Sequence, residues 1–164
     1  MGFEIDEYIY GKFVRHFKKS KKIDVEILNR TIYLNNIKPR LTILVRALTG
    51  KPIEIFPAER EGGYKNNNFF LPISFSQLST KKDNLTFYLF RILYLSIQQR
   101  LNLNWTLEEK DQPLALSQQK AFETSEEILD ILFEEFSIDK KFHAETKQHF
   151  IQKENGKNAP DFSW

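Results

Sequence analysis

The side chains that most often perform chemistry in proteins are few in this sequence. It has three histidines and no cysteine, which excludes thiolate catalysis, disulfides and cysteine-ligated metals. His143 and His149 are six positions apart in a segment expected to be helical, whereas two ligands on one helix face need a spacing of three or four. His16 stands among basic residues. We therefore interpret all three as exposed helix histidines, and expect no metal, no cofactor and no catalytic residue.

A second candidate for chemistry is a polar stretch in which two acids flank a base and precede a glycine pair: Glu59, Arg60, Glu61, Gly62 and Gly63. Paired carboxylates beside a turn could transfer protons, but no nucleophile or metal ligand accompanies them. The glycine pair lacks the spacing of a phosphate-binding loop and the Lys-Ser/Thr that would follow it. We interpret the stretch as turn residues with solvated charges.

Arg91 is the third candidate, because it lies in the most apolar segment of the chain. A charge in such a segment is rarely left without a partner. We expect an ion pair with Glu54 or Glu61, or a position at the edge of the helix, and keep a buried polar site as the alternative. An enzyme with an unrecognised carboxylate site near Glu59, Glu61 and Arg91 stays open as a hypothesis.

Charge is unevenly distributed along the chain. Residues 1–106 hold 17 Lys and Arg against 9 Asp and Glu, whereas residues 107–164 hold 7 against 13. The main interpretation is two parts that attract each other, or solvated faces. A small basic cluster, made of Lys18, Lys19, Lys21 and Lys22, supports nucleic-acid binding as a further alternative.

The length of 164 residues fits one domain with an ample apolar supply, including 15 Phe, 6 Tyr and 2 Trp. No stretch approaches the roughly 18 apolar residues of a membrane helix, so no membrane insertion is expected. Acids interrupt the apolar residues near the N-terminus at Glu4, Asp6 and Glu7, which a signal peptide would not tolerate. We expect a cytoplasmic protein.

The elements that must position these residues are mostly helices. The apolar pattern predicts a long central helix over 84–102, further helices over 3–17, 37–49, 125–136 and 140–153, and two short strands at 52–57 and 69–73. Segment 23–34 is ambiguous between strands and an irregular structure. We predict an α+β fold: one mostly helical domain over 1–153, with a small β-hairpin packed on the central helix, and an irregular tail over 154–164.

One part of the chain also resembles a known family. The matching residues run through Arg40–Gly50, Ile53–Ile55, Glu61–Gly63, Leu71–Pro72 and then Asn84, Tyr88, Arg91 and Tyr94. In this order they resemble the N-terminal region of NorD/CbbO-type proteins: an Arg-Ala-Leu-x-Gly helix end, a short strand, a glycine loop, Leu-Pro and a long helix. The resemblance covers about residues 25–105.

Large members of that family carry a C-terminal von Willebrand A domain and work beside MoxR-type AAA+ ATPases in the maturation of metalloenzymes. The resemblance therefore implies a non-enzymatic adaptor or chaperone-like domain whose partner is an AAA+ ATPase. The chain departs from the large members because it has no Asp-x-Ser-x-Ser motif. The order of hairpin and long helix also resembles metallopeptidases, but Tyr94–Gln98 lacks His-Glu-x-x-His, so a degenerate metallopeptidase-like domain stays as an alternative.

We expect the partner to bind the connection between the two strands, since a long polar loop on a rigid hairpin is where function tends to lie. The predicted contact residues are Glu59, Arg60, Glu61, Gly62, Gly63, Tyr64 and Lys65.

Overall fold

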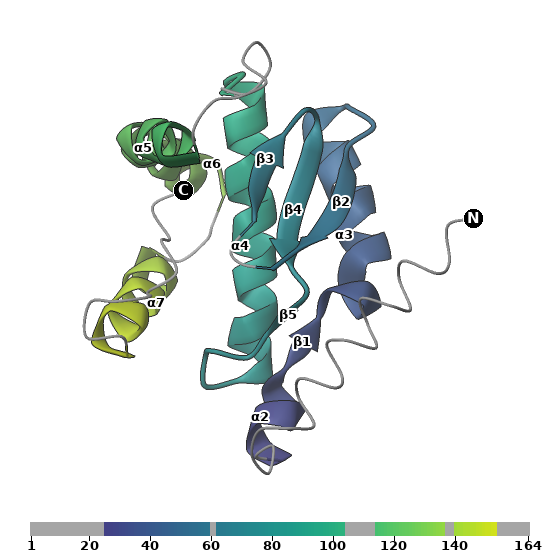
Figure 1. Ribbon diagram of the computed structural model, residues 1–164, viewed down its shortest axis with the longest axis vertical. Coiled ribbons are helices and arrows are strands. Elements are labelled where there is room, and N and C mark those ends of the chain that lie inside the picture. Colours follow the sequence, from purple (N-terminus) through teal and green to yellow (C-terminus); the bar gives the residue numbers. More distant parts are fainter. Residues whose placement is uncertain (1–24, 60–61, 104–113, 137–139, 154–164) are drawn as a thin grey trace.

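The computed structural model describes residues 25–59, 62–103, 114–136 and 140–153, and these form an α+β fold (Figure 1). The fold class predicted from the sequence is confirmed. The elements follow one another as α2 (Val25–Arg30), β1 (Ile32–Tyr33), α3 (Leu34–Thr49), β2 (Glu54–Ala58), β3 (Gly63–Lys65), β4 (Asn68–Pro72), β5 (Ser74–Phe75), α4 (Lys81–Arg100), α5 (Leu114–Glu123), α6 (Ser125–Glu135) and α7 (Lys140–Lys153).

Helix α4 is the central element, as its apolar pattern predicts. It is 20 residues long and buries most of its circumference, because α3 and the sheet contact it as well as α6. Thr80 begins the helix: its hydroxyl oxygen accepts a hydrogen bond from the backbone N–H of Asp83 at 3.0 Å. The carboxylate of Asp83 also lies in the first turn, where the helix dipole favours negative charge.

The strands predicted at 52–57 and 69–73 exist as β2 and β4, but the prediction that they form a hairpin is wrong. They pair in parallel, with Ile55 opposite Phe69, and the strand order is β2-β4-β3. After β2 the chain forms β3 at the opposite edge of the sheet. It then turns back and forms β4 between β2 and β3. A connection thought to be one long polar loop is therefore partly a strand.

The hairpin of the fold is formed by β3 and β4 instead. Lys65 pairs with Asn68, so only Asn66 and Asn67 connect the strands. Both have positive φ, 50° and 60°, as the central residues of a type I′ turn must, and asparagine tolerates this conformation well.

One face of the three-stranded sheet packs against α3 and α4 and contributes Ile55, Phe69 and Leu71 to the core, all with 0% exposure. Side chains alternate along a strand, so the neighbouring residues point to the opposite face. In Figure 1 the sheet lies in front of α3 and α4, and no described helix lies in front of it. The sheet is therefore buried on one side only within the described part of the chain.

Asn84 joins three separate segments. Its amide nitrogen donates to the backbone oxygens of Arg30, Leu78 and Thr80 at 2.8–3.1 Å, and its side-chain oxygen accepts from the Leu78 N–H at 2.9 Å. Within the ambiguous segment 23–34, the described residues first form helix α2, which neither interpretation anticipated, and then strand β1, which pairs with β5. Asn84 thus fixes the end of α2 against the start of α4.

Helix α3 ends as its sequence predicts. Gly50 adopts the left-handed conformation with φ of 64°, and its N–H donates to Arg46 O at 2.9 Å. The helix begins earlier than expected, at Leu34. The helix predicted over 3–17 and the tail predicted over 154–164 lie outside the described residues. In the described part of the chain, no helix combines the length and apolar character needed to cross a bilayer.

Candidate interaction surface

The residues predicted to contact a partner do not share one loop. Glu59 is exposed directly after β2, while Arg60 and Glu61 lie outside the described residues. Gly63, Tyr64 and Lys65 form β3. Positions along this strand therefore alternate between the two faces of the sheet.

Gly62 has a structural role that explains why a glycine stands there. Its φ is 78°, and a Cβ atom at this position would lie 1.8 Å from the carbonyl oxygen of Phe70 and 2.4 Å from its carbonyl carbon. The chain crosses over to the far side of β4 in direct contact with the backbone of that strand. Any other residue would force the two backbones apart.

Tyr64 anchors β3 from the inner face. Its ring meets that of Phe69 edge to face, with centroids 5.9 Å apart. Its hydroxyl donates to the side-chain oxygen of Asn67 at 3.3 Å. Burial raises the pKa of the Tyr64 hydroxyl, so it stays protonated. Tyr64 is therefore a packing residue, whereas Lys65 is exposed on the outer face.

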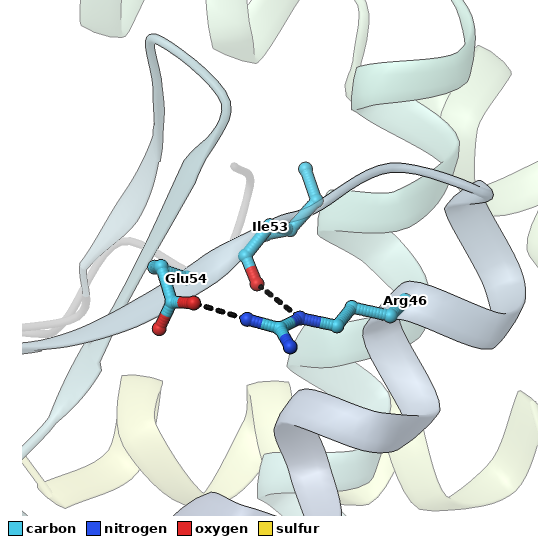
Figure 2. Close-up of polar contacts among 3 residues, drawn as sticks. All are labelled: Arg46, Ile53 and Glu54. Atoms are coloured by element: carbon cyan, nitrogen blue, oxygen red, sulfur yellow. Dashed lines mark hydrogen bonds and ion pairs between the residues drawn. The ribbon is translucent and has the colours of Figure 1, made fainter.

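Glu54 is not the partner of Arg91, and that prediction is wrong. Figure 2 shows Arg46 reaching from α3 to the start of β2, where its guanidinium forms an ion pair with the Glu54 carboxylate and donates from Nε to Ile53 O at 3.3 Å. The side chains of Arg46 and Glu54 are about half exposed, at 47% and 49%. This pair attaches the edge strand to α3, and the charge of Glu54 is compensated.

Arg91 is buried, with 1% exposure, so it does not lie at the exposed edge of the helix. Its guanidinium carbon lies 5.4 Å from the ring centroid of Tyr94, one turn further along α4. The other predicted partner, Glu61, lies outside the described residues. Glu59 is exposed and Arg91 is buried, and no ion pair joins these two described members of the hypothetical carboxylate site.

His143 is not an exposed helix histidine, which corrects that part of the prediction. It lies half-buried between two rings, stacked on Phe90 of α4 at 5.4 Å and edge to face with Phe133 of α6 at 5.8 Å. Burial lowers its pKa, and the nearby charge of Lys147 lowers it further. Through this side chain α7 is attached to the rest of the fold.

A small pocket of about 160 Å³ lies between α7 and the start of α4. It is lined by Leu78, Ser79, Asp83, Phe142, Glu145, Thr146 and His149. Among the described residues, no group of three or more His, Asp or Glu is arranged to hold a metal ion.

The surface that sequence reasoning missed is the outer face of the sheet. Strand register and alternation give it three rows: Glu54, Asn68 and Lys65; then Phe56, Phe70 and Gly63; then Ala58 and Pro72. In the middle row the rings of Phe56 and Phe70 stack with centroids 5.8 Å apart and an angle of 29°. Phe56 is 42% exposed and Phe70 is half-buried.

Both phenylalanines were recognisable as strand residues but not as surface residues. The runs Ile53–Phe56 and Phe69–Leu71 contain apolar residues at neighbouring positions, and such a pattern is also typical of a strand that is buried on both faces. The one available signal was Glu54, whose charge marks its own side of β2 as exposed. Phe56 lies on that same side.

We name the surface formed by Phe56, Phe70, Gly63, Lys65 and the adjoining Lys38 the outer sheet face. The ammonium group of Lys38, in α3, lies 5.9 Å from the ring centroid of Phe56. Comparison of the chain with protein-family models, with curated proteins and with solved structures finds no match in any of the three.

Proposed function

We propose that this chain is a non-enzymatic protein-interaction domain, and that the outer sheet face is its docking surface. The observation that carries the proposal is the stacked pair of Phe56 and Phe70 on the uncovered side of the sheet. These rings stay partly exposed to solvent after the described residues have folded. Burying them against a partner would therefore give a favourable hydrophobic contribution to binding.

The arrangement around the rings also suits a docking surface. Aromatic side chains are enriched at the centres of protein interfaces, and polar groups form the rim. Here the aromatic pair is central, while Lys38, Lys65 and the Arg46–Glu54 ion pair surround it. The strands underneath are held by the core, so the surface is organised before a partner arrives.

The partner we propose is a cytoplasmic AAA+ ATPase of the MoxR type. This part of the proposal rests on the resemblance of residues 25–105 to the N-terminal region of NorD/CbbO-type proteins. The domain would then act as an adaptor in a chaperone-like system that matures a metalloenzyme. No step of this role requires a catalytic residue in the chain itself.

A pull-down from cells that produce the chain tests this function. The bait is the full chain, and its Phe56→Ser variant serves as the surface mutant. Phe122→Ser is the matched control, because Phe122 is another exposed phenylalanine, at 61% exposure, on α5. We expect mass spectrometry to identify an AAA+ ATPase with the wild type and with Phe122→Ser, but not with Phe56→Ser.

Two outcomes would contradict the proposal. If no ATPase is recovered from a lysate that contains one, the proposed partner is wrong. If the ATPase is recovered equally with all three baits, the partner stands but the outer sheet face does not bind it.

A further inference from the structure

The outer sheet face has an uneven charge. Lys38 lies beside Phe56, and Lys65 lies one row away from Phe70 on β3. Within the described residues, neither lysine forms an ion pair. The one carboxylate among the three rows, that of Glu54, is paired with Arg46. Among the described residues of this face, the uncompensated charges are therefore both positive.

The next described acid along the chain after Glu54 is Glu59. It follows Ala58, at the end of β2 opposite to the row that holds Lys65. Three positions separate Phe56 from Glu59, about 10 Å at the usual rise per residue. Glu59 and Lys65 therefore lie toward opposite ends of the face.

The two phenylalanine rings stack on one another, Phe70 lying against Phe56 from the β4 side, and the ammonium group of Lys38 lies 5.9 Å from the centroid of the Phe56 ring. The ring faces that meet in this stack are closed to a nucleic-acid base. Ring edges carry partial positive charge and make good apolar contacts, and they favour carboxylates nearby.

We infer that the element of the partner that docks on the outer sheet face is an acidic segment of a protein. It seats an apolar side chain over the edges of Phe56 and Phe70 and directs carboxylates to Lys38 and Lys65. This inference rests on the proposed function, because it names the chemistry of the partner at the same surface. Charge complementarity of this kind sets the choice of partner and the rate of encounter.

Site-specific photocrosslinking tests the inference with the full chain in the cells that produce it. Phe56→p-benzoylphenylalanine places the reactive group on the outer sheet face while keeping an aromatic ring there. The same replacement of Phe122 gives the background. We expect a crosslink at position 56 to a protein segment rich in Asp and Glu, identified by mass spectrometry of the crosslinked peptide.

Charge reversal provides the decisive comparison. The double variant Lys38→Glu with Lys65→Glu should lower the crosslink yield about tenfold. Lys81→Glu with Lys82→Glu makes the same change of net charge at exposed lysines of α4 and should leave the yield unchanged. Thermal unfolding of each variant verifies that the fold is retained.

Every other result overturns the inference. One group of such results is a crosslink to a neutral or basic protein segment, to nucleic acid or to a second copy of this chain. The other group is a crosslink yield that does not exceed the Phe122 background, or a yield that Lys38→Glu with Lys65→Glu leaves unchanged. The identity of the crosslinked protein separates this test from that of the proposed function. An acidic segment of a protein that is not an ATPase supports the inference and contradicts the proposed partner. An ATPase that is pulled down without a crosslink at position 56 contradicts the inference and the position of the docking surface, but not the proposed partner.

Discussion

At the scale of single residues, the clearest constraint is the contact between Gly62 and the backbone of β4. The missing side chain lets the chain cross from β2 to β3 against the carbonyl group of Phe70. This crossing creates the parallel pairing of β2 with β4 and so brings Phe56 next to Phe70. The aromatic pair of the outer sheet face thus depends on a glycine that is not itself part of that face.

Replacing Gly62 with alanine should destabilise the protein by about 3 kcal/mol or more, since strain at positive φ adds to a steric clash with backbone atoms. Gly50→Ala is the matched control. Gly50 also has positive φ, 64°, but a Cβ there would meet nothing within 4 Å. We expect that control to cost about 1 kcal/mol. Urea denaturation measures both values, and equal losses would contradict the close approach at Gly62.

Asn84 is the second residue whose replacement should be costly. Asn84→Ala would leave the buried N–H of Leu78 and up to three carbonyl groups without this partner. We expect a loss of about 2–3 kcal/mol in the free energy of unfolding. Thr86→Ala, two residues further along α4, removes only a hydrogen bond to Lys82 O within the same helix. A loss from Asn84→Ala no larger than that from Thr86→Ala would refute this role.

At the scale of elements, α4 is held by a different contact on each side. Thr80 caps the start of α4. At the end of α4, Arg100 forms an ion pair with Glu135 of α6 through two hydrogen bonds of 2.7 and 2.8 Å. Helix α7 packs against α4 through the stacking of His143 on Phe90. The hydrogen bonds from Arg100 lower the pKa of Glu135. Among these contacts, the one that involves a histidine is that of His143, whose pKa burial lowers below 6.5.

Docking of α7 should therefore weaken on acidification. The pKa of His143 in the folded protein lies below the ordinary value of 6.5 because of burial. The unfolded chain then binds more protons between those two pKa values, so stability is fully present above about pH 6.5 and is lost as the pH falls through the lowered pKa. His143→Phe keeps the ring stacking and should remove this part of the pH dependence.

Thermal unfolding of the wild type and His143→Phe between pH 7.5 and 5 measures this effect. We expect the difference in melting temperature between the two proteins to change as the pH falls below 6.5. A difference that stays constant over this range would mean that His143 does not titrate in contact with Phe90 and Phe133.

Some elements of the fold could be predicted from the sequence and others could not. Helix α4 was predictable because its apolar residues cover most of its circumference, and the end of α3 because Gly50 stops it. The parallel pairing of β2 with β4 was not predictable from the sequence, because strand propensity is a local property. Parallel pairing depends instead on the path that the chain takes between the two strands. Of the predicted contact residues, Lys65 and Gly63 lie on the proposed docking surface, whereas Phe56 and Phe70 were assigned only to strands.

At the scale of the whole molecule, the described fold is a helical core with one half-covered sheet (Figure 1). The core elements α3 and α4 fix the strands from behind, and α5, α6 and α7 lie on the other side of α4. This arrangement leaves the outer sheet face as a rigid platform. The proposed adaptor function makes use of that rigidity, because a partner can dock without paying for the ordering of a mobile loop.

The affinity of the purified full chain for the ATPase captured with it tests the central claim most directly. Isothermal titration with the wild type, Phe56→Ser and Phe122→Ser should show that Phe56→Ser weakens binding about 30-fold, the effect of truncating a central aromatic side chain in an interface. Phe122→Ser should bind like the wild type. If Phe56→Ser binds with unchanged affinity, or Phe122→Ser is weakened equally, the outer sheet face is not the docking surface.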